Sequence, residues 1–435
     1  MLSSLPVPRL NRCDRAELLA YFENAWDIED CLLGSLRSDD AFYLSPDPLR
    51  NRLIFYLGHS AVFYINKLIR VGWLDRRIEP HFEILFEIGV DPSTPEELES
   101  AMANVQWPEV DRVWAYRRSA REEVARTIRT ATLDEASDRP LQDRPLWALM
   151  MGIEHQRIHF ETSSMLLRQL DADRLRRPEE WGYAPTAGKA NNTLVPVAGG
   201  RAMLGKPRSS DTYGWDSDYG SREVTVKPFL AGQTPVTNGE FFKFVRDGGY
   251  ENPEFWGAQP PDSSHPKFWQ IERDHVRYRT VFEEIDLPLS WPVEVNHHEA
   301  MAYCRWYGER TRLMSEAEWQ VASRAASDRS DAANLDLQFG SPSPVGSFER
   351  ERDGLYDLRG NVWEWLGDDF TGLPGFEPHP LYADYSEPFF KDRHDGQHKV
   401  MRGGSWASTG AYASSRNWFR PYFYQHAGFR IARDA

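Results

Sequence analysis

The segment Asp357-Leu-Arg-Gly-Asn-Val-Trp-Glu-Trp365 typifies the C-terminal half of the chain, where glycine, tryptophan and tyrosine are dense. From about residue 194 onward the predicted strands are short and turn residues are frequent. Clear helical patterns in this half cover 297–308 and 315–326. This mixture predicts an irregular α+β domain with much loop, and long loops in a compact domain are often functional.

The chain changes character upstream of this domain. Proline, glycine and asparagine are frequent between 171 and 200, which indicates a linker, and we place it at 176–194. The linker separates a first domain, 1–175, from a second domain, 195–435. The length of 435 residues agrees with two domains or three small ones.

The first domain carries apolar residues at helical spacing. One helical pattern begins at Asp14, and the others cover 51–71, 109–132 and 145–170. The last pattern opens at Pro145, a residue favoured in the first turn of a helix. Four long helices with modest connections predict a helical bundle. The expected fold class of the whole chain is therefore α+β, a four-helix bundle followed by an irregular domain.

Charge and composition exclude several classes of protein. The 51 basic and 66 acidic residues give a net charge of −15, which argues against a general nucleic-acid or anionic-membrane surface. No apolar run approaches the roughly 18 residues that a membrane span needs, and the N-terminus lacks the apolar core of a signal peptide. Cys13, Cys31 and Cys304 form no C-x-x-C pair, and such scattered cysteines suit a cytoplasmic protein.

The sharpest chemical signal is His155-Gln-Arg-Ile-His159 in the fourth helical pattern. Histidines four positions apart lie on one face of a helix, so both imidazoles can reach one metal ion. Glu161 lies about 200° further round the helix than His159, which makes it a poor co-ligand. His59 lies in an apolar helical stretch and is the best third ligand, because a buried histidine needs a hydrogen bond or a metal.

Other interpretations of these histidines remain open from the residues alone. A His-x-x-x-His pair on a helix also arises by chance, and His59 by itself is more often a hydrogen-bonded core residue. The pair is not His-Glu-x-x-His, so the base of a zinc protease is missing. Three neutral imidazoles with open positions suit iron(II) or zinc.

Four segments of the second domain are distinctive and follow one another in a fixed order. They are Gln233-Thr-Pro-Val-Thr-Asn238, Arg312-Leu-Met-Ser-Glu-Ala-Glu-Trp319, Asp357–Trp365, and Arg402-Gly-Gly-Ser-Trp406 with Ala427-Gly-Phe-Arg430. Together they resemble the formylglycine-generating-enzyme-like (sulfatase-modifying-factor-type) domain, which has a C-type-lectin-like fold. This resemblance covers about 195–435 and identifies a fold more than a reaction. Cys304 is the only cysteine there, so the copper-binding cysteine pair of true formylglycine-generating enzymes is absent.

The N-terminal half extends the resemblance to the whole chain. A DinB-like four-helix bundle with His59, His155 and His159, fused to such a domain, is similar to the iron-dependent sulfoxide synthases of thiohistidine biosynthesis. The resemblance implies that the three histidines hold a non-haem Fe(II) ion and that O2 is a co-substrate. It also implies the reaction, which joins the sulfur of cysteine to the imidazole of a histidine derivative and oxidises the sulfur to a sulfoxide.

Several short segments carry a closer likeness within this family. They are Tyr43–Arg50, Leu53–His59, Phe63–Lys67, Ile88–Asp91, Leu373–Phe376 and Gln425–Phe429. With them the chain looks most like 5-histidylcysteine sulfoxide synthase, the enzyme of ovothiol biosynthesis, which uses histidine as the acceptor. Such enzymes usually continue into a methyltransferase domain, whereas this chain stops at Ala435. A separate methyltransferase is therefore an expected partner in the pathway.

Hercynine is the alternative acceptor. The element Arg416-Asn-Trp418 resembles the one with which ergothioneine-type enzymes hold the trimethylammonium group of hercynine. A tryptophan face attracts a quaternary ammonium ion, so Asn417 and Trp418 are candidates for binding the amino end of the acceptor. A selenoneine synthase, which uses a selenosugar as the donor, is a further alternative in this superfamily.

The remaining candidate residues also follow from the resemblance. A tyrosine near the iron is expected to direct the reaction to sulfoxide synthesis and away from thiol dioxygenation, and the candidates are Tyr382 and Tyr385. An amino-acid carboxylate needs a cationic partner, and the candidates are Arg416 and Arg420. Without the resemblance, the two tyrosines would be interpreted as ordinary packed rings and the two arginines as ordinary surface residues.

The sequence leaves two other functions open. The bundle could be a scaffold and the second domain a non-catalytic lectin-like binding module, or the same iron site could belong to a thiol dioxygenase. The expected partners are small molecules, namely cysteine with histidine or hercynine, and neither nucleic acid nor membrane.

Overall fold

The structure is a computed structural model of the 435-residue chain. It describes residues 2–12, 14–87, 89, 94–133, 140–188, 192–272, 275–308, 310–325, 332–348, 354–386 and 397–435. The chain divides into two compact units. One comprises Ser3–Glu179 with Asp211–Tyr213, and the other comprises Glu180–Ser210 and Gly214–Ala435 together with Leu2. Cys13 and most of the segment 88–91 lie outside the described residues.

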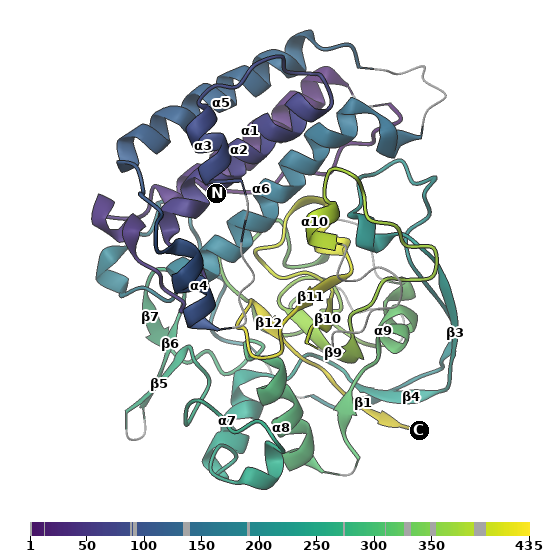
Figure 1. Ribbon diagram of the computed structural model, residues 1–435. Coiled ribbons are helices and arrows are strands. Elements are labelled where there is room, and N and C mark those ends of the chain that lie inside the picture. The colour runs from purple at the N-terminus through teal and green to yellow at the C-terminus, as the bar shows by residue number, and fades with distance from the viewer. Residues whose placement is uncertain are drawn as a thin grey trace. The chain divides into compact units, whose positions relative to one another are not determined.

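The first unit is helical. Its long helices are α1 (Arg15–Leu33), α2 (Leu53–Arg70), α5 (Val110–Thr130) and α6 (Pro145–Leu167), and the sequence predicts all four. Helices α1 and α2 each pack against both α5 and α6, which gives a bundle (Figure 1). Two short helices, α3 (Pro80–Leu85) and α4 (Pro95–Met102), lie in the connection between α2 and α5 and were not predicted.

Helices α2 and α6 form the centre of the bundle. Every side chain of α2 from Leu53 to Asn66 is buried, and α6 is buried over most of its length. A helix that is covered on all sides must satisfy its polar side chains within the protein. Among the described residues, no helix is long and apolar enough to cross a membrane.

The second unit is a mixture of small sheets, short helices and loops. Two four-stranded sheets have the strand orders β1-β4-β13-β8 and β11-β10-β9-β12, and two further sheets have the orders β2-β3 and β5-β6-β7. The strands are β1 (Leu194–Val197), β2 (Gly200–Leu204), β3 (Arg222–Val226), β4 (Phe229–Gly232), β5 (Trp269–Glu272), β6 (His275–Arg279), β7 (Glu284–Asp286), β8 (Arg312–Leu313), β9 (Trp363–Asp369), β10 (Lys399–Arg402), β11 (Asn417–Phe419), β12 (Ala427–Gly428) and β13 (Ile431–Asp434). The helices are α7 (Asn238–Arg246), α8 (His297–Tyr307), α9 (Glu316–Ala322) and α10 (Ala383–Ser386).

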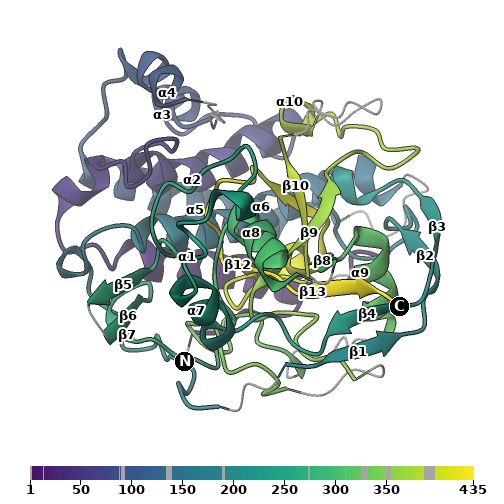
Figure 2. The same ribbon diagram turned by 90° about the horizontal axis from the view of Figure 1, so that it is seen from below.

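All strand pairs are antiparallel among the described residues except β12 with β9, which is parallel. The C-terminal strand β13 pairs with β4, and β4 pairs with β1 (Figure 2). Helices α8 and α9 are the two that the sequence predicts, whereas α7 was missed. The observed fold class is thus α+β, as expected.

The segment Asp357–Trp365 connects the two larger sheets. Glu364 of β9 accepts hydrogen bonds from Arg430, whose guanidinium also donates to the carbonyl of Gly232 in β4. Both side chains of this ion pair are buried. Gly360 has a φ of +75°, and a Cβ there would lie 2.4 Å from the Asn334 carbonyl oxygen, so only glycine fits. Glu364 and Gly360, which carry part of the family resemblance in this segment, are therefore structural.

Candidate metal centre and substrate site

Three histidines converge inside the helical unit. His59 lies in the middle of α2, and His155 and His159 lie one turn apart on α6. One ligand atom from each histidine lies within 4.8 Å of the other two. The Nε2 atoms of His155 and His159 are 3.1 Å apart. The structure thus brings together the three residues that the sequence proposes as metal ligands.

The orientation of His59 is fixed by a backbone contact. Its Nδ1 atom donates to the carbonyl oxygen of Phe86 over 2.6 Å, which leaves Nε2 as the nitrogen with a free lone pair. A hydrogen bond of this kind orients a metal-binding imidazole and fixes its tautomer. The rings of Phe55 and Phe63 stack on His59 and His155, with centroid distances of 4.7 Å and 3.7 Å.

Burial keeps these imidazoles uncharged. It lowers the pKa of His59 to about 4, and it lowers the pKa of His155 and of His159 well below the ordinary value. The neighbouring histidines and the positive charge of Lys67 lower the pKa of His155 further. At neutral pH all three rings are therefore neutral and can offer lone pairs to a metal. Glu161 is also buried but does not belong to the cluster, in agreement with its position on the helix.

The donor set fits a metal ion. Two imidazole nitrogens bound to one ion at about 2.1 Å and near a right angle lie about 3 Å apart, and the Nε2 atoms of His155 and His159 have this separation. The Nδ1 atom of His159 is buried, and the described residues give it no hydrogen-bond partner. Neutral imidazoles suit iron(II) or zinc, and three protein ligands leave further positions open for substrates.

Most of the other predicted site residues gather at one place in the second unit, near α10 and β11. The rings of Tyr385 and Trp418 are stacked with centroids 5.3 Å apart, and Tyr382 lies 5.0 Å from Tyr385. The Tyr385 side chain is half exposed, whereas burial raises the pKa of Tyr382 well above its ordinary value. The structure thus joins two tyrosines and a tryptophan that the sequence proposes separately.

The polar candidates on β11 and just beyond it have defined partners. The Asn417 amide donates to the Tyr412 hydroxyl over 2.6 Å, and its oxygen accepts from the Trp418 backbone N–H. Arg420 donates to the Gln397 side chain over 2.6 Å. His398 packs edge-on against Trp418 with a centroid distance of 4.6 Å. Sequence reasoning missed Tyr412, Gln397 and His398, because no motif marks them.

Arg416 is placed differently from a ligand-binding arginine. Its guanidinium makes a two-pronged ion pair with Glu316 at 2.7 and 2.9 Å, and both side chains are buried. It also donates to the carbonyl oxygens of Ser217 and Thr371. A substrate carboxylate would have to displace Glu316 to bind there, so Arg420 is the better cation of the two.

Comparisons with known proteins match a family model to the second unit and find relatives of most of the chain. Residues 180–435 match the family model described as the sulfatase-modifying factor enzyme 1-like domain. The chain is 31% identical to "Hercynine oxygenase" from Mycolicibacterium thermoresistibile, over 89% of this chain and 88% of that protein. It is likewise 31% identical to "Hercynine oxygenase" from Mycolicibacterium smegmatis, over 71% of this chain and 76% of that one. "Ergothioneine biosynthesis protein 1" from Neurospora crassa is 25% identical over 98% of this chain and 59% of its own length.

Proposed function

Because the chain belongs to the family of the hercynine oxygenases, the thiohistidine sulfoxide synthases, we propose that it is an iron(II)- and O2-dependent sulfoxide synthase. In this proposal it joins the sulfur of cysteine to the imidazole of a histidine-type acceptor. The observation that carries the proposal is the cluster of three neutral, convergent histidines in a chain that is 31% identical to a hercynine oxygenase.

The proposed reaction balances without an external reductant. The thiol loses its hydrogen, the imidazole loses one ring C–H hydrogen, and a carbon–sulfur bond forms. One atom of O2 becomes the sulfoxide oxygen, and the other leaves as water with the two hydrogens. A bound iron ion would supply the redox chemistry of these steps. The chain itself would hold the two substrates in position and exclude water.

We propose histidine as the acceptor, which makes the product 5-histidylcysteine sulfoxide. Support comes from the segments that resemble the ovothiol-type enzymes, among them Tyr43–Arg50 and Leu53–His59. Hercynine is the second candidate, because the partly buried ring of Trp418 beside Tyr385 suits a trimethylammonium group, and two of the relatives named above are hercynine oxygenases.

Roles follow for the residues of the second unit. Arg420 would pair with a substrate carboxylate, and Asn417 with Trp418 would bind the amino end of the acceptor. Tyr385 is the better of the two tyrosines for directing the oxidation, since its side chain is half exposed, whereas Tyr382 is less exposed and packs against Trp215 and Tyr385.

The function is tested by product identification. The purified protein is supplied with Fe(II), O2 and cysteine, and either histidine or hercynine is added in separate reactions. We expect a product with the mass of cysteine plus histidine plus one oxygen atom minus two hydrogens. With 18O2 the product should carry one labelled oxygen. His298→Gln, which alters a histidine outside the metal cluster, serves as the active control.

Three outcomes would contradict the proposal in different ways. Oxygen uptake that needs cysteine but no acceptor would indicate a thiol dioxygenase. A product formed from hercynine and not from histidine would replace the acceptor and keep the reaction. A protein that binds no iron and forms no product with either acceptor would be a binding module.

The acceptor can also be probed at Trp418. If hercynine is used, Trp418→Ala should raise the KM for hercynine by roughly twofold to thirtyfold, since cation–π contacts are worth about 0.5–2 kcal/mol. The KM for histidine should change much less, because its ammonium group has N–H donors for hydrogen bonds, which a trimethylammonium group lacks. Steady-state kinetics of the wild type and the variant give the change in KM for each acceptor. An equal change in both KM values would show that Trp418 does not distinguish a trimethylammonium from an ammonium group.

A further inference from the structure

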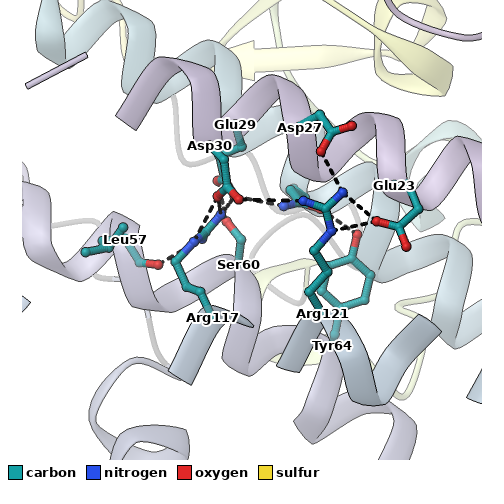
Figure 3. A network of polar contacts seen from close by, with 10 residues as sticks. Glu23, Asp27, Glu29, Asp30, Leu57, Ser60, Tyr64, Arg117 and Arg121 are labelled. Atoms are coloured by element: carbon teal, nitrogen blue, oxygen red, sulfur yellow. Dashed lines mark hydrogen bonds and ion pairs between the residues drawn. The ribbon is translucent and has the colours of Figure 1, made fainter. Parts of the chain in front are cut away.

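A buried polar cluster in the core of the helical bundle takes no part in the chemistry proposed so far (Figure 3). Its centre is the carboxylate of Glu29 on α1, which is fully buried. Oε1 accepts a hydrogen bond from Ser60 Oγ over 2.6 Å. Oε2 accepts from Gln156 Nε2 over 2.9 Å and from Arg117 Nη2 over 3.0 Å. These partners lie on α2, α6 and α5, so one carboxylate connects the four long helices.

Arg117 extends the cluster. Its guanidinium is buried and donates to Asp30 on α1, and Nη1 donates to the backbone carbonyl of Leu57 on α2 over 2.9 Å. Tyr64, also on α2, donates its hydroxyl to Gln156 Oε1 over 2.8 Å. Helix α2 is therefore held at Leu57, Ser60 and Tyr64, over about two turns.

The anchored residues are the immediate neighbours of the metal ligands. Ser60 follows His59 on α2, and Gln156 follows His155 on α6. Consecutive residues of a helix point about 100° apart, so the two imidazoles face one side of the bundle interior while Ser60 and Gln156 turn to Glu29. The hydrogen bonds to Glu29 thereby fix how far each helix is rotated about its own axis.

Rotation of a helix has a large effect on a metal ligand. Cα atoms lie about 2.3 Å from the helix axis, and an imidazole nitrogen at the end of an extended side chain lies about 6 Å from it. A rotation of about 10° would therefore move that nitrogen by about 1 Å. Metal–ligand distances tolerate a deviation of only about 0.2 Å. The rotations of α2 and α6 must accordingly be set more precisely than apolar packing requires.

We propose that Glu29 and Arg117 are positioning residues of the metal centre, which hold α2 and α6 at the rotations that bring His59 and His155 to one ion. Neither residue belongs to the metal cluster, and both act through Ser60, Gln156 and the Leu57 carbonyl. The inference rests on the metal site of the proposed function. A buried ion pair often adds little net stability compared with apolar side chains of equal volume, and its best-attested use is to fix one arrangement of packed elements.

The test compares two variants with a matched control. Glu29→Gln removes the negative charge opposite Arg117, and its amide N–H₂ replaces one carboxylate oxygen, so the hydrogen bonds that this oxygen accepts, from Ser60 or from Arg117 and Gln156, are lost. Arg121→Gln removes ion pairs between the same helices α5 and α1, to Glu23 and Asp27 and, over 3.8 Å, to Asp30, and it leaves the contacts of Glu29 and Arg117 in place. For each protein, the Fe(II) dissociation constant is measured by chelator competition, and the EPR spectrum of the nitric oxide adduct reports the ligand geometry.

We expect Glu29→Gln to raise the Fe(II) dissociation constant at least tenfold and to alter the EPR spectrum, while Arg121→Gln stays within twofold of the wild type. If Glu29→Gln does not fold, Ser60→Ala removes only one of the three anchors of α2 and keeps every charge, and an increase of at least threefold with an altered spectrum is expected. Wild-type affinity and an unchanged spectrum in the folded variants would overturn the inference and leave the proposed function intact. A wild-type chain that binds no iron would refute the metal site and this inference together.

Discussion

Replacing His155 or His159 by alanine is expected to abolish iron binding and turnover while the bundle stays folded. Two nitrogens cannot replace three at an ion that must also hold substrates, so losing either residue removes the site. The fold should persist, because burial keeps the imidazoles neutral, so that the loss of one ring leaves no buried charge without compensation. Iron content after anaerobic reconstitution and product formation measure the first effect, and far-UV circular dichroism measures the second.

His298 provides the control for this experiment. It is a partly exposed histidine on α8, outside the metal cluster, and His298→Ala should retain full iron content. A His155→Ala protein that still binds one equivalent of iron would refute the ligand assignment. Loss of the helical spectrum in the same variant would mean that the ring serves the fold as well.

Much of the metal centre follows from local sequence. A spacing of four residues on a helix places His155 and His159 on one face whatever the tertiary structure is, and the apolar surroundings of His59 indicate burial. The same reasoning excludes Glu161 from the cluster. Local periodicity therefore predicts the ligands because they lie on long, regular helices.

The groups around the ligands could not be predicted in this way. Phe86 orients His59 through a backbone carbonyl, and any residue type could supply that oxygen. Glu29 and Arg117 meet across the bundle although they are 88 positions apart. On α1 and α5 each of them looks like an ordinary charged residue of an exposed helix face, so only the packing of the helices reveals their burial.

In the second unit, too, the partners of the predicted residues could not be inferred from the sequence. Arg416 follows a motif that suggests substrate binding, but its charge is taken up by Glu316, which the sequence places 100 residues away. The contact of Tyr385 with Trp418 likewise joins α10 to β11. Sequence motifs mark such residues as special, yet whether a residue binds a ligand or holds a loop depends on partners that are distant in the chain.

A tight contact between the two ligand-bearing helices gives the second large expected effect. Gly152 lies on α6 against the ring of Tyr64 on α2, and a Cβ at this position would lie 2.4 Å from the ring atom Cδ1. The ring cannot easily yield, because Phe22 and Trp26 pack against it at centroid distances of 5.4 and 5.6 Å and its hydroxyl is bonded to Gln156. An added methyl group must therefore push α2 and α6 apart.

Gly152→Ala should accordingly lower the free energy of unfolding by about 1–2 kcal/mol, since overpacking costs about 1–3 kcal/mol and the better helix propensity of alanine returns up to about 1 kcal/mol. Iron binding should weaken as well, because His155 and His59 move with their helices. Urea unfolding of the metal-free protein measures the first effect, and chelator competition measures the second. In the background of Tyr64→Leu, which retracts the opposing ring, the same glycine substitution should cost much less, and this coupling separates a steric effect from one on the helix alone. A Gly152→Ala protein that gains the stability expected from helix propensity, with unchanged iron affinity, would show that the interface of α2 and α6 is loose and that the metal ligands are not positioned by its packing.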